Sequence, residues 1–379
     1  MWVVVERLIQ RQPFNVDALN PQKEQPMKCD KYMGMDVHQA MTVVVVLDAN
    51  GSVILETMVP TEAAAIIRLV QSLSGPLRVT FEESTQAAWL YEMIRTYVTD
   101  VIVCDPRRNK LLEDGSKADK VDARKLAELL RAGLLRSVYH GHEATRNLKE
   151  LVRAYETLSI DTQRTMARIK AIYRARGIQT PGRGVYQPKQ RERWLQLLRE
   201  AGIRQRVAWL YEQLDQLQPL RRKAKQAMLA ESRRHRAVSL LRTIPQMGPI
   251  RCAFIVATVD TPHRFRTKRQ FWSYVGLAVV THMSSEYEMM AGRVVRRRKP
   301  VATRGLNHNC NKRLKEVFIS AAIGGSLHEP YKPFLERLKQ SGMRAEMARL
   351  TLARKIAAVA LIVWKKGVAF DPKKLNCTT

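Results

Sequence analysis

Four carboxylates in the first third of the sequence have types and spacings that suit divalent-metal chemistry. Asp36 ends the segment YMGMD, just before a strongly β-forming stretch, and Glu82 ends the strand-like segment RVTFE. Asp119 and Asp122 lie three residues apart at the start of a predicted helix, so they share one helix face. Mg²⁺ and Mn²⁺ prefer oxygen ligands, and paired ions stabilise the attacking and leaving oxygens in phosphodiester chemistry. The four acids together predict a metal-dependent phosphodiester site.

Each of these acids also has a purely structural interpretation. A carboxylate such as Asp36 in an apolar strand must be desolvated, which costs free energy unless a cation or hydrogen bonds compensate. Asp119 could serve only as the negative charge that the N-terminus of a helix favours. Glu83 follows Glu82 directly and points to the opposite face if the strand continues, because side chains alternate along a strand.

Two serines and a run of cations in the last third of the chain form a second candidate site. Ser284 and Ser285 precede six basic residues: Arg293, Arg296, Arg297, Arg298, Lys299 and Arg304. A serine nucleophile needs a base or a metal ion, and the charge that develops on the phosphate needs stabilisation. The alternative is a pair of serines that cap a turn beside a solvated basic face.

A turn-forming segment lies upstream of these serines. The residues IPQMGP, from Ile244 to Pro249, separate two apolar helical runs. They resemble the turn of a helix–hairpin–helix unit, whose backbone amides contact phosphate. Turns of proline and glycine between helices are common, so this motif alone is weak.

The charge balance predicts a polyanionic partner. The 379 residues include 65 Lys and Arg against 35 Asp and Glu, a formal net charge of +30. Phosphates attract such a protein without any sequence readout. A membrane is the competing polyanion, but no run of about 18 apolar residues occurs. The hydrophobic content of 45% excludes a disordered chain, so we expect a folded nucleic-acid-binding protein.

The five cysteines indicate a reducing compartment. They are far apart, and none forms a CxxC pair. This pattern matches neither a disulfide framework nor a zinc site. We therefore expect the protein in the cytoplasm.

The elements that must position the four acids predict a mixed α/β layer. Residues 32–48 and 52–60 predict two strands of a hairpin, joined by a turn at Asn50 and Gly51. Hydrophobic periodicity then predicts helices over 61–74, 87–98 and 119–135, with strands over 77–84 and 100–106 between them. Interleaved strands and helices of this kind are typical of an α/β domain.

Composition divides the chain into five predicted segments. They are an N-terminal extension over 1–30, the α/β domain over 31–142, a helical region over 143–235, a mainly α C-terminal domain over 236–370 and a tail over 371–379. Translation from Met27 instead of Met1 would place most of the extension upstream of the protein, and both starts remain open.

The region 143–235 predicts long basic helices. Its apolar residues recur at helical spacing, with Arg and Lys on the other face, and the loop QTPGRGVYQPKQ interrupts it. Long antiparallel helices with apolar seams favour a coiled-coil arm that joins protomers. A plain helical subdomain is the alternative.

Several motifs, in order, resemble the DEDD-type insertion-sequence transposases of the IS110 family. MDVHQAMTVVVVLD, FEESTQAAWLYEMI, VIVCDPRRNK and KADKVDARKLAELL resemble the N-terminal domain of that family. LLRTIPQMGP, FRTKRQFWSYVGLAVVTHMSS, GRVVRRRKPVATRGLN and YKPFLERLKQSGMRAEMARLTLARKIA resemble its C-terminal transposase domain. The motif sequence VGLAV…SSEY…GRVVRR resembles the IS1111 subgroup of this family more closely. The resemblance covers about residues 27–366.

The resemblance implies a fold and a set of site residues. The family combines an RNase H-like, RuvC-like domain with a D-E-D-D metal site, a coiled coil and a C-terminal domain that contributes a serine nucleophile. Carried over, the metal ligands are Asp36, Glu82, Asp119 and Asp122, and the nucleophile is Ser284. The cofactor expected is Mg²⁺ or Mn²⁺.

Two departures from the family pattern bear on these assignments. The segment FEEST leaves either Glu82 or Glu83 as the ligand, and Glu82 is preferred because it ends the strand after the alternating Val79 and Phe81. The segment MSS leaves Ser284, which aligns best, or Ser285.

The resemblance also implies a reaction and partners. Members of this family are RNA-guided recombinases: a noncoding bridge RNA pairs with target and donor DNA, and the serine forms a phosphoserine link before strands are exchanged. We therefore expect DNA, a bridge RNA and further copies of the chain, as a dimer or tetramer, as partners in the bacterial cytoplasm at the nucleoid. The basic residues near 293–304 would hold phosphates.

Two other classes of function remain open. A RuvC-like Holliday-junction endonuclease would use the same carboxylates with water as the nucleophile, and would need neither the serine nor RNA. A nucleic-acid-binding protein with a decayed nuclease core would show no metal-dependent activity, but all four acids are present in this chain.

Overall fold

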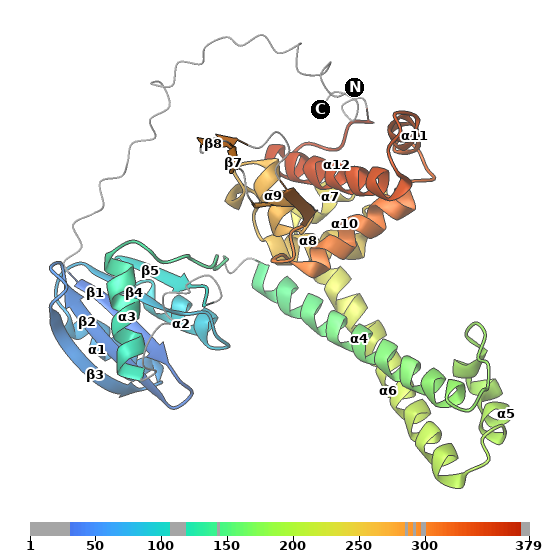
Figure 1. The fold of residues 1–379 in the computed structure, drawn as a ribbon. Coiled ribbons are helices and arrows are strands. Elements are labelled where there is room, and N and C mark those ends of the chain that lie inside the picture. Colours follow the sequence, from blue (N-terminus) through green and yellow to red (C-terminus); the bar gives the residue numbers. More distant parts are fainter. Residues whose placement is uncertain are drawn as a thin grey trace. The chain divides into compact units, whose positions relative to one another are not determined.

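The computed structural model describes residues 31–106, 119–141, 145–284, 287–290, 293–296 and 301–372. Within this part, the chain divides into two compact units, one that ends at His140 and one that begins at Gly141. Figure 1 shows the sheet-containing first unit and the mainly helical second unit. No helix in the described part is long and apolar enough to cross a membrane.

The first unit is built on a mixed five-stranded sheet. Its strands are β1 (Lys31–Val37), β2 (Met41–Asp48), β3 (Val53–Pro60), β4 (Leu77–Glu82) and β5 (Asp100–Cys104), in the order β3-β2-β1-β4-β5. β2 is antiparallel to both β1 and β3, whereas β4 is parallel to β1 and to β5. The predicted mixed α/β layer is therefore confirmed.

The prediction of one long strand over 32–48 is wrong. The chain turns at His38, Gln39 and Ala40, so that β1 and β2 form a hairpin in which Val37 lies opposite Thr42. The backbone N–H of His38 donates to the carbonyl of Met41 at 3.1 Å. The apolar residues on both sides hid this turn, because both strands are buried and their side chains do not alternate with polar ones.

The predicted turn between β2 and β3 is confirmed. Gly51 has a φ of +92°, a conformation that side chains other than glycine rarely adopt. The carboxylate of Asp48 accepts hydrogen bonds from the backbone N–H groups of Asn50 and Ser52, both at 2.8 Å. The polar turn thus fixes the register of β2 against β3.

Helices cover both faces of the sheet. They are α1 (Ala63–Ser72), α2 (Ala87–Ile94) and α3 (Asp119–Arg131). Val44 and Val46 of β2 pack in one cluster with α1 and α2, whereas Val43 and Val45 pack in another with Ala123 of α3. Successive residues of β2 thus face opposite helical layers, and α3 crosses the face of the sheet opposite α1 and α2 (Figure 1).

The second unit begins with a long helical hairpin. α4 (Arg146–Arg174) and α6 (Ala201–Ser232) pack along each other, and two short 3₁₀ turns and α5 (Arg191–Gln196) connect them. Tyr173, Trp194 and Tyr211 form a small core near the connection. The predicted long helices are confirmed, but this pairing lies within one chain. A coiled coil between protomers stays a prediction.

The rest of the second unit is a helical domain that carries two strand pairs. Its helices are α7 (Arg236–Leu241), α8 (Pro249–Val259), α9 (Lys268–Tyr274), α10 (Lys312–Gly325), α11 (Lys332–Gln340) and α12 (Ala345–Lys366). Ile255, Phe271, Phe318 and Ile356 lie in its core. In the described part of the chain three helices follow β9, and Gly342, with a φ of +84°, separates α11 from α12.

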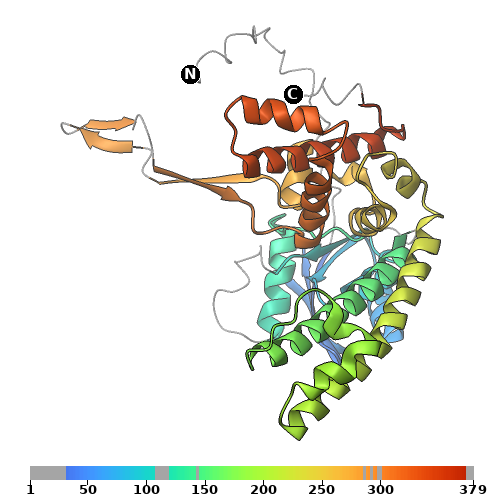
Figure 2. The same cartoon turned by 90° about the vertical axis from the view of Figure 1, so that its right-hand side faces the viewer.

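The segment between α9 and α10 forms strands that the sequence analysis did not predict. β6 (Val279–Ser284) pairs with β9 (Val301–Leu306), and β7 (Tyr287–Met290) pairs with β8 (Arg293–Arg296), both antiparallel. Figure 2 shows both ribbons projecting from the helices of this unit. The sequence shows no clear strand pattern here, because the β7–β8 side chains whose burial is described, such as Tyr287, Met289 and Met290, are exposed and impose no alternation.

Candidate metal centre

Two of the predicted acids lie side by side at the ends of neighbouring parallel strands. The register of β1 and β4 places Met35 opposite Phe81, and Asp36 and Glu82 are the next residue on each strand. Both acids point to the face that α3 covers, because Gly34, two residues before Asp36, lies against α3. Ligands of open α/β sheets bind at this carboxyl edge of the parallel strands.

The other two acids come from the first turn of α3. The helix begins at Asp119, and Asp122 follows one turn later. The absence of a side chain at Gly34 permits α3 to lie directly on β1, because a Cβ there would sit 2.6 Å from the backbone nitrogen of Ala127 and closer still to the carbonyl oxygen of Ala123. This close packing brings the start of the helix to the strand that carries Asp36.

The electrostatics of the carboxylates join all four into one cluster. Burial raises the pKa of Asp36; His38 opposes this shift, and the charges of Asp119 and Asp122 add to it. Burial also raises the pKa of Glu82, and the charges of Asp36 and Asp122 raise it further. Electrostatic interaction thus links the four acids that the sequence analysis selected, but Glu82 and Asp122 do not belong to the compact group of possible ligand atoms that contains Asp36 and Asp119.

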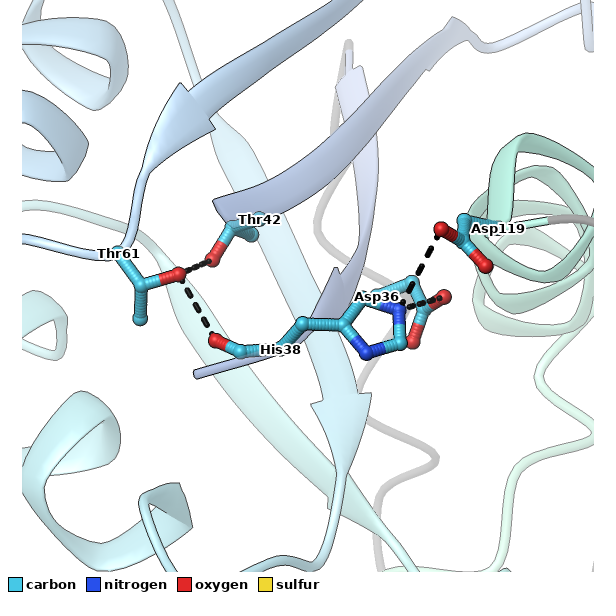
Figure 3. Close-up of polar contacts among 5 residues, drawn as sticks. All are labelled: Asp36, His38, Thr42, Thr61 and Asp119. Atoms are coloured by element: carbon cyan, nitrogen blue, oxygen red, sulfur yellow. Dashed lines mark hydrogen bonds and ion pairs between the residues drawn. The ribbon is translucent and has the colours of Figure 1, made fainter. Parts of the chain in front are cut away.

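A histidine that the sequence analysis missed lies among these acids. The Nε2 atom of His38 is 3.1 Å from Oδ2 of Asp36 and 3.6 Å from Oδ2 of Asp119 (Figure 3). Ligand atoms of these three residues all lie within 4.8 Å of one another, close enough to hold a metal ion. The only sequence signal for His38 was its position two residues after Asp36. That spacing carries no information when both residues are predicted to lie on one continuous strand.

The turn that carries His38 is tied to the sheet. The hydroxyl of Thr61 donates to the backbone carbonyl of His38 at 2.9 Å and lies 2.8 Å from the hydroxyl of Thr42 (Figure 3). Thr42 is fully buried on β2. This chain of hydrogen bonds fixes the backbone of His38, although its side chain is 54% exposed.

Glu83 has a different partner from Glu82. Its Oε2 atom is 2.7 Å from Nε2 of His140, and the imidazole of His140 stacks on the ring of Tyr91 at a centroid distance of 5.0 Å. The His140 side chain is only 10% exposed, so this pair is held firmly. The carboxylate of Glu83 is thus engaged outside the cluster, which favours Glu82 as the fourth acid of the site.

The chemistry of the cluster fits Mg²⁺ or Mn²⁺. Hard divalent ions take carboxylate oxygens, and dimanganese carboxylate sites in proteins also include histidine ligands. The raised pKa values of Asp36 and Glu82 reflect partial burial and like charges, two costs that a bound cation would offset. The residues present therefore suit a divalent ion of this class.

The candidate nucleophile belongs to the second unit. Ser284 is the last residue of β6 and pairs with Val301 of β9. Arg293 and Arg296 begin and end β8, and Arg304 lies in β9. The remaining predicted residues lie outside the described part of the chain: Ser285, Arg297, Arg298 and Lys299.

The segment Ile244–Pro249 is a turn between two helices, as predicted. It joins α7 to α8, and Gln246 within it adopts a φ of +67°. The guanidinium of Arg251 donates to the carbonyl of Gln246 at 2.5 Å, and the hydroxyl of Tyr331 donates to the carbonyl of Pro245 at 3.3 Å. These contacts hold the turn in place, and phosphate contact by its amides stays a prediction.

Two family models match the chain. The model of the IS110 DEDD transposases, described as "Transposase", matches residues 33–174 and spans all four carboxylates. A model described as "Transposase IS116/IS110/IS902 family" matches residues 238–332 and spans Ser284. No curated protein matches the chain. Since the two models together cover more than half of the sequence, the chain carries both transposase domains of the IS110 family.

Proposed function

We propose that this chain is an RNA-guided DNA transposase that cuts and exchanges DNA strands with a D-E-D-D metal site and a serine nucleophile. The two matched transposase domains support DNA transposition as the function. The observation that carries the metal-site assignment is the convergence of Asp36, Glu82, Asp119 and Asp122 from two parallel strand ends and one helix start.

The carboxylates and the serine would divide the chemistry between them. Asp36, Glu82, Asp119 and Asp122 would hold Mg²⁺ or Mn²⁺, which neutralises charge on the phosphate and lowers the pKa of a bound hydroxyl. The Ser284 oxygen would form a bond to phosphorus as the bond from phosphorus to one deoxyribose oxygen breaks. The covalent link would conserve the phosphoester bond, so that the DNA end can be joined to a second strand. Hydrolysis by water would lose that bond.

The donor contacts of His38 suit a positioning role in this site. Its Nε2 atom lies within hydrogen-bond distance of Asp36 and faces Asp119. An imidazole there would orient the Asp36 carboxylate, as groups around a metal site commonly do.

The charge and the long helices support the proposed partners. A net charge of +30 suits a protein that holds DNA and a guide RNA, with sequence read by base pairing and not by side chains. Trp209 and Leu220 on α6 are 60% and 47% exposed, which suits a further helix packing there in a homo-oligomer. We place this activity at the bacterial nucleoid.

The test is purification with the bound RNA, followed by cleavage of target and donor DNA. We expect one abundant RNA encoded beside the gene, and a covalent protein–DNA adduct that resists denaturation. Ser284→Ala should bind both nucleic acids and form no adduct, whereas Ser285→Ala should form it. Cleavage that persists in both variants without an adduct would favour the junction endonuclease with water as nucleophile. Heterogeneous RNA released by moderate salt would remove the guide from the proposal.

A further inference from the structure

A pocket of about 300 Å³ lies between α9 and α12 in the second unit, far along the chain from the carboxylates. Its size is at the lower end of the range of small-molecule sites, about 300–1,000 Å³. Trp272, Val359 and Ile362 give it an apolar lining, and Thr351 adds a hydroxyl. The two helices that form it lie next to each other in the helical domain (Figure 1).

The charged lining of this pocket is all of one sign. Lys268, Arg354 and Lys355 line it, and none of the described lining residues is acidic. An apolar floor with only cations around it suits a flat ring that is joined to a negatively charged group. A purely apolar peptide side chain would leave these cations without a partner from the ligand.

The indole of Trp272 is held in a fixed orientation. Its Nε1 atom donates to the backbone carbonyl of Arg354 at 2.9 Å, so the polar edge of the ring is satisfied within the protein. The Nζ atom of Lys268 lies 5.7 Å from the ring centroid. An aromatic ring with a cation beside it is the arrangement that binds a nucleobase and its phosphate in single-stranded nucleic acid.

The guanidinium of Arg354 has an unused donor. Its Nε atom donates to the carbonyl of Leu277 at 2.6 Å, but its Nη2 atom is buried and meets no acceptor among the described residues. Burial also lowers the pKa of this arginine. A buried donor left without an acceptor costs free energy.

We infer that this pocket holds one unpaired base of a bound nucleic acid, stacked on Trp272, with its phosphate at Lys268 and a carbonyl or phosphate oxygen at Arg354. A base within a duplex is stacked on both faces, so only an extruded or single-stranded base can enter. The inference rests on the proposed function only in requiring that the chain binds nucleic acid.

The test uses the full chain and a single-stranded oligonucleotide whose only base is one 2-aminopurine on an otherwise abasic backbone. Anisotropy of an end label reports backbone binding, and quenching of 2-aminopurine reports stacking. We expect the wild-type protein to quench the probe. Thr351→Phe, which fills the pocket, should reduce the quenching at least about fivefold while backbone binding changes much less.

Matched variants separate the pocket from general effects. Met347→Phe places the same ring one turn away on α12, at a 46% exposed position outside the pocket, and should quench as the wild type does. Lys268→Glu should weaken quenching more than Arg269→Glu, the same charge change at the next exposed residue of α9. Equal effects within either pair would overturn the inference.

The same assay distinguishes failure of the inference from failure of the proposed function. Glu62→Gln, at an exposed position of the first unit outside the metal centre, should leave the quenching unchanged. Backbone binding without quenching by the wild type would remove the base pocket and leave the transposase proposal standing. Absence of any backbone binding would contradict the proposed function itself.

Discussion

Gly34 on β1 lies directly against the backbone of Ala123 on α3, with no room for a side chain between them. A Cβ at Gly34 would sit 2.6 Å from the backbone nitrogen of Ala127 and closer still to the carbonyl oxygen of Ala123. Asp36 follows two residues later on the strand, and Asp119 begins the helix. The distance between strand and helix therefore also sets the distance between two acids of the candidate metal centre.

We expect Gly34→Ala to push α3 away from the sheet and weaken metal binding. Overpacking of this kind costs about 1–3 kcal/mol of unfolding free energy. Thermal unfolding and Mn²⁺ titration of the same variant measure both effects. Gly202→Ala on α6 is the control, because its new methyl group meets nothing within 4 Å and alanine is the better helix former. A Gly34→Ala variant with unchanged Mn²⁺ affinity would separate helix packing from the site.

The contribution of Asp36 and Glu82 to the stability of the metal-free protein should fall as the pH rises through the acidic range. Partial burial and mutual repulsion raise the folded-state pKa values of Asp36 and Glu82 above their unfolded values. At a pH between the unfolded-state and the folded-state pKa of each acid, the folded state binds more protons than the unfolded state. The contribution of that acid to the unfolding free energy therefore falls as the pH rises through this window. Above the raised folded values the full penalty is present, and a divalent ion should offset it.

Denaturation of the chain in EDTA and in Mg²⁺ at neutral pH tests this prediction. Asp36→Asn or Glu82→Gln should raise the melting temperature in EDTA by about 2–4 °C for each kcal/mol of relieved repulsion. Both variants should lose the stabilisation that Mg²⁺ gives the wild type. The exposed Glu62→Gln should change neither value. Variants that are less stable than the wild type in EDTA at neutral pH would contradict the sign of the effect.

Asp119→Asn should abolish strand cleavage while the protein stays folded. The side chain is 60% exposed at the start of α3, so its loss removes a ligand without opening the core. Removal of a direct ligand should lower the rate by more than the roughly 10–100-fold that supporting groups contribute. Circular dichroism and cleavage under single-turnover conditions measure the two outcomes. Asp100 on β5 forms an ion pair with Arg78 on β4 and lies outside the site, so the Asp100→Asn variant should cleave DNA normally.

Glu82→Gln and Glu83→Gln should behave differently although the residues are adjacent. Glu82 shares its electrostatic environment with Asp36 and Asp122, whereas Glu83 pairs with His140. We expect the first variant to lose Mn²⁺ binding and cleavage and the second to keep both. A reversed result would move the fourth ligand to Glu83 and require β4 to twist beyond Phe81.

The sequence was sufficient to select the acids because strand ends and helix starts are local features. Glu82 follows an alternating segment, and Asp119 and Asp122 precede a periodic one, so their elements could be predicted without tertiary information. The alternative between Glu82 and Glu83 needed the structure, since only the contact with His140 shows where the second carboxylate goes.

What the sequence could not predict depends on burial and on partners distant in the chain. The turn at residues 38–40 lies between two strands that are apolar on both faces, so no change of period marks it. The pocket residue Arg354 lies on a helix with a broad buried face. It forms hydrogen bonds with Trp272 and Leu277, about 80 residues earlier in the chain, and the sequence does not indicate such distant contacts. The apolar side chains of β7 and β8 whose burial is described, such as Tyr287, Met289 and Val295, are exposed, so no buried face imposes alternation on them.

His38→Gln should weaken Mn²⁺ binding by about 10–100-fold, the range for groups that position a metal ligand. Its Nε2 atom lies between Asp36 and Asp119, and the glutamine amide can replace only part of that contact. Thr61→Ala removes the hydroxyl that holds the His38 backbone, and should produce a smaller loss in the same direction. Mn²⁺ titration followed by electron paramagnetic resonance measures both affinities. The adjacent exposed Gln39→Ala is the control, and it should leave the affinity unchanged. If all three variants bound Mn²⁺ equally well, His38 would be only a turn residue and the site would consist of the carboxylates alone.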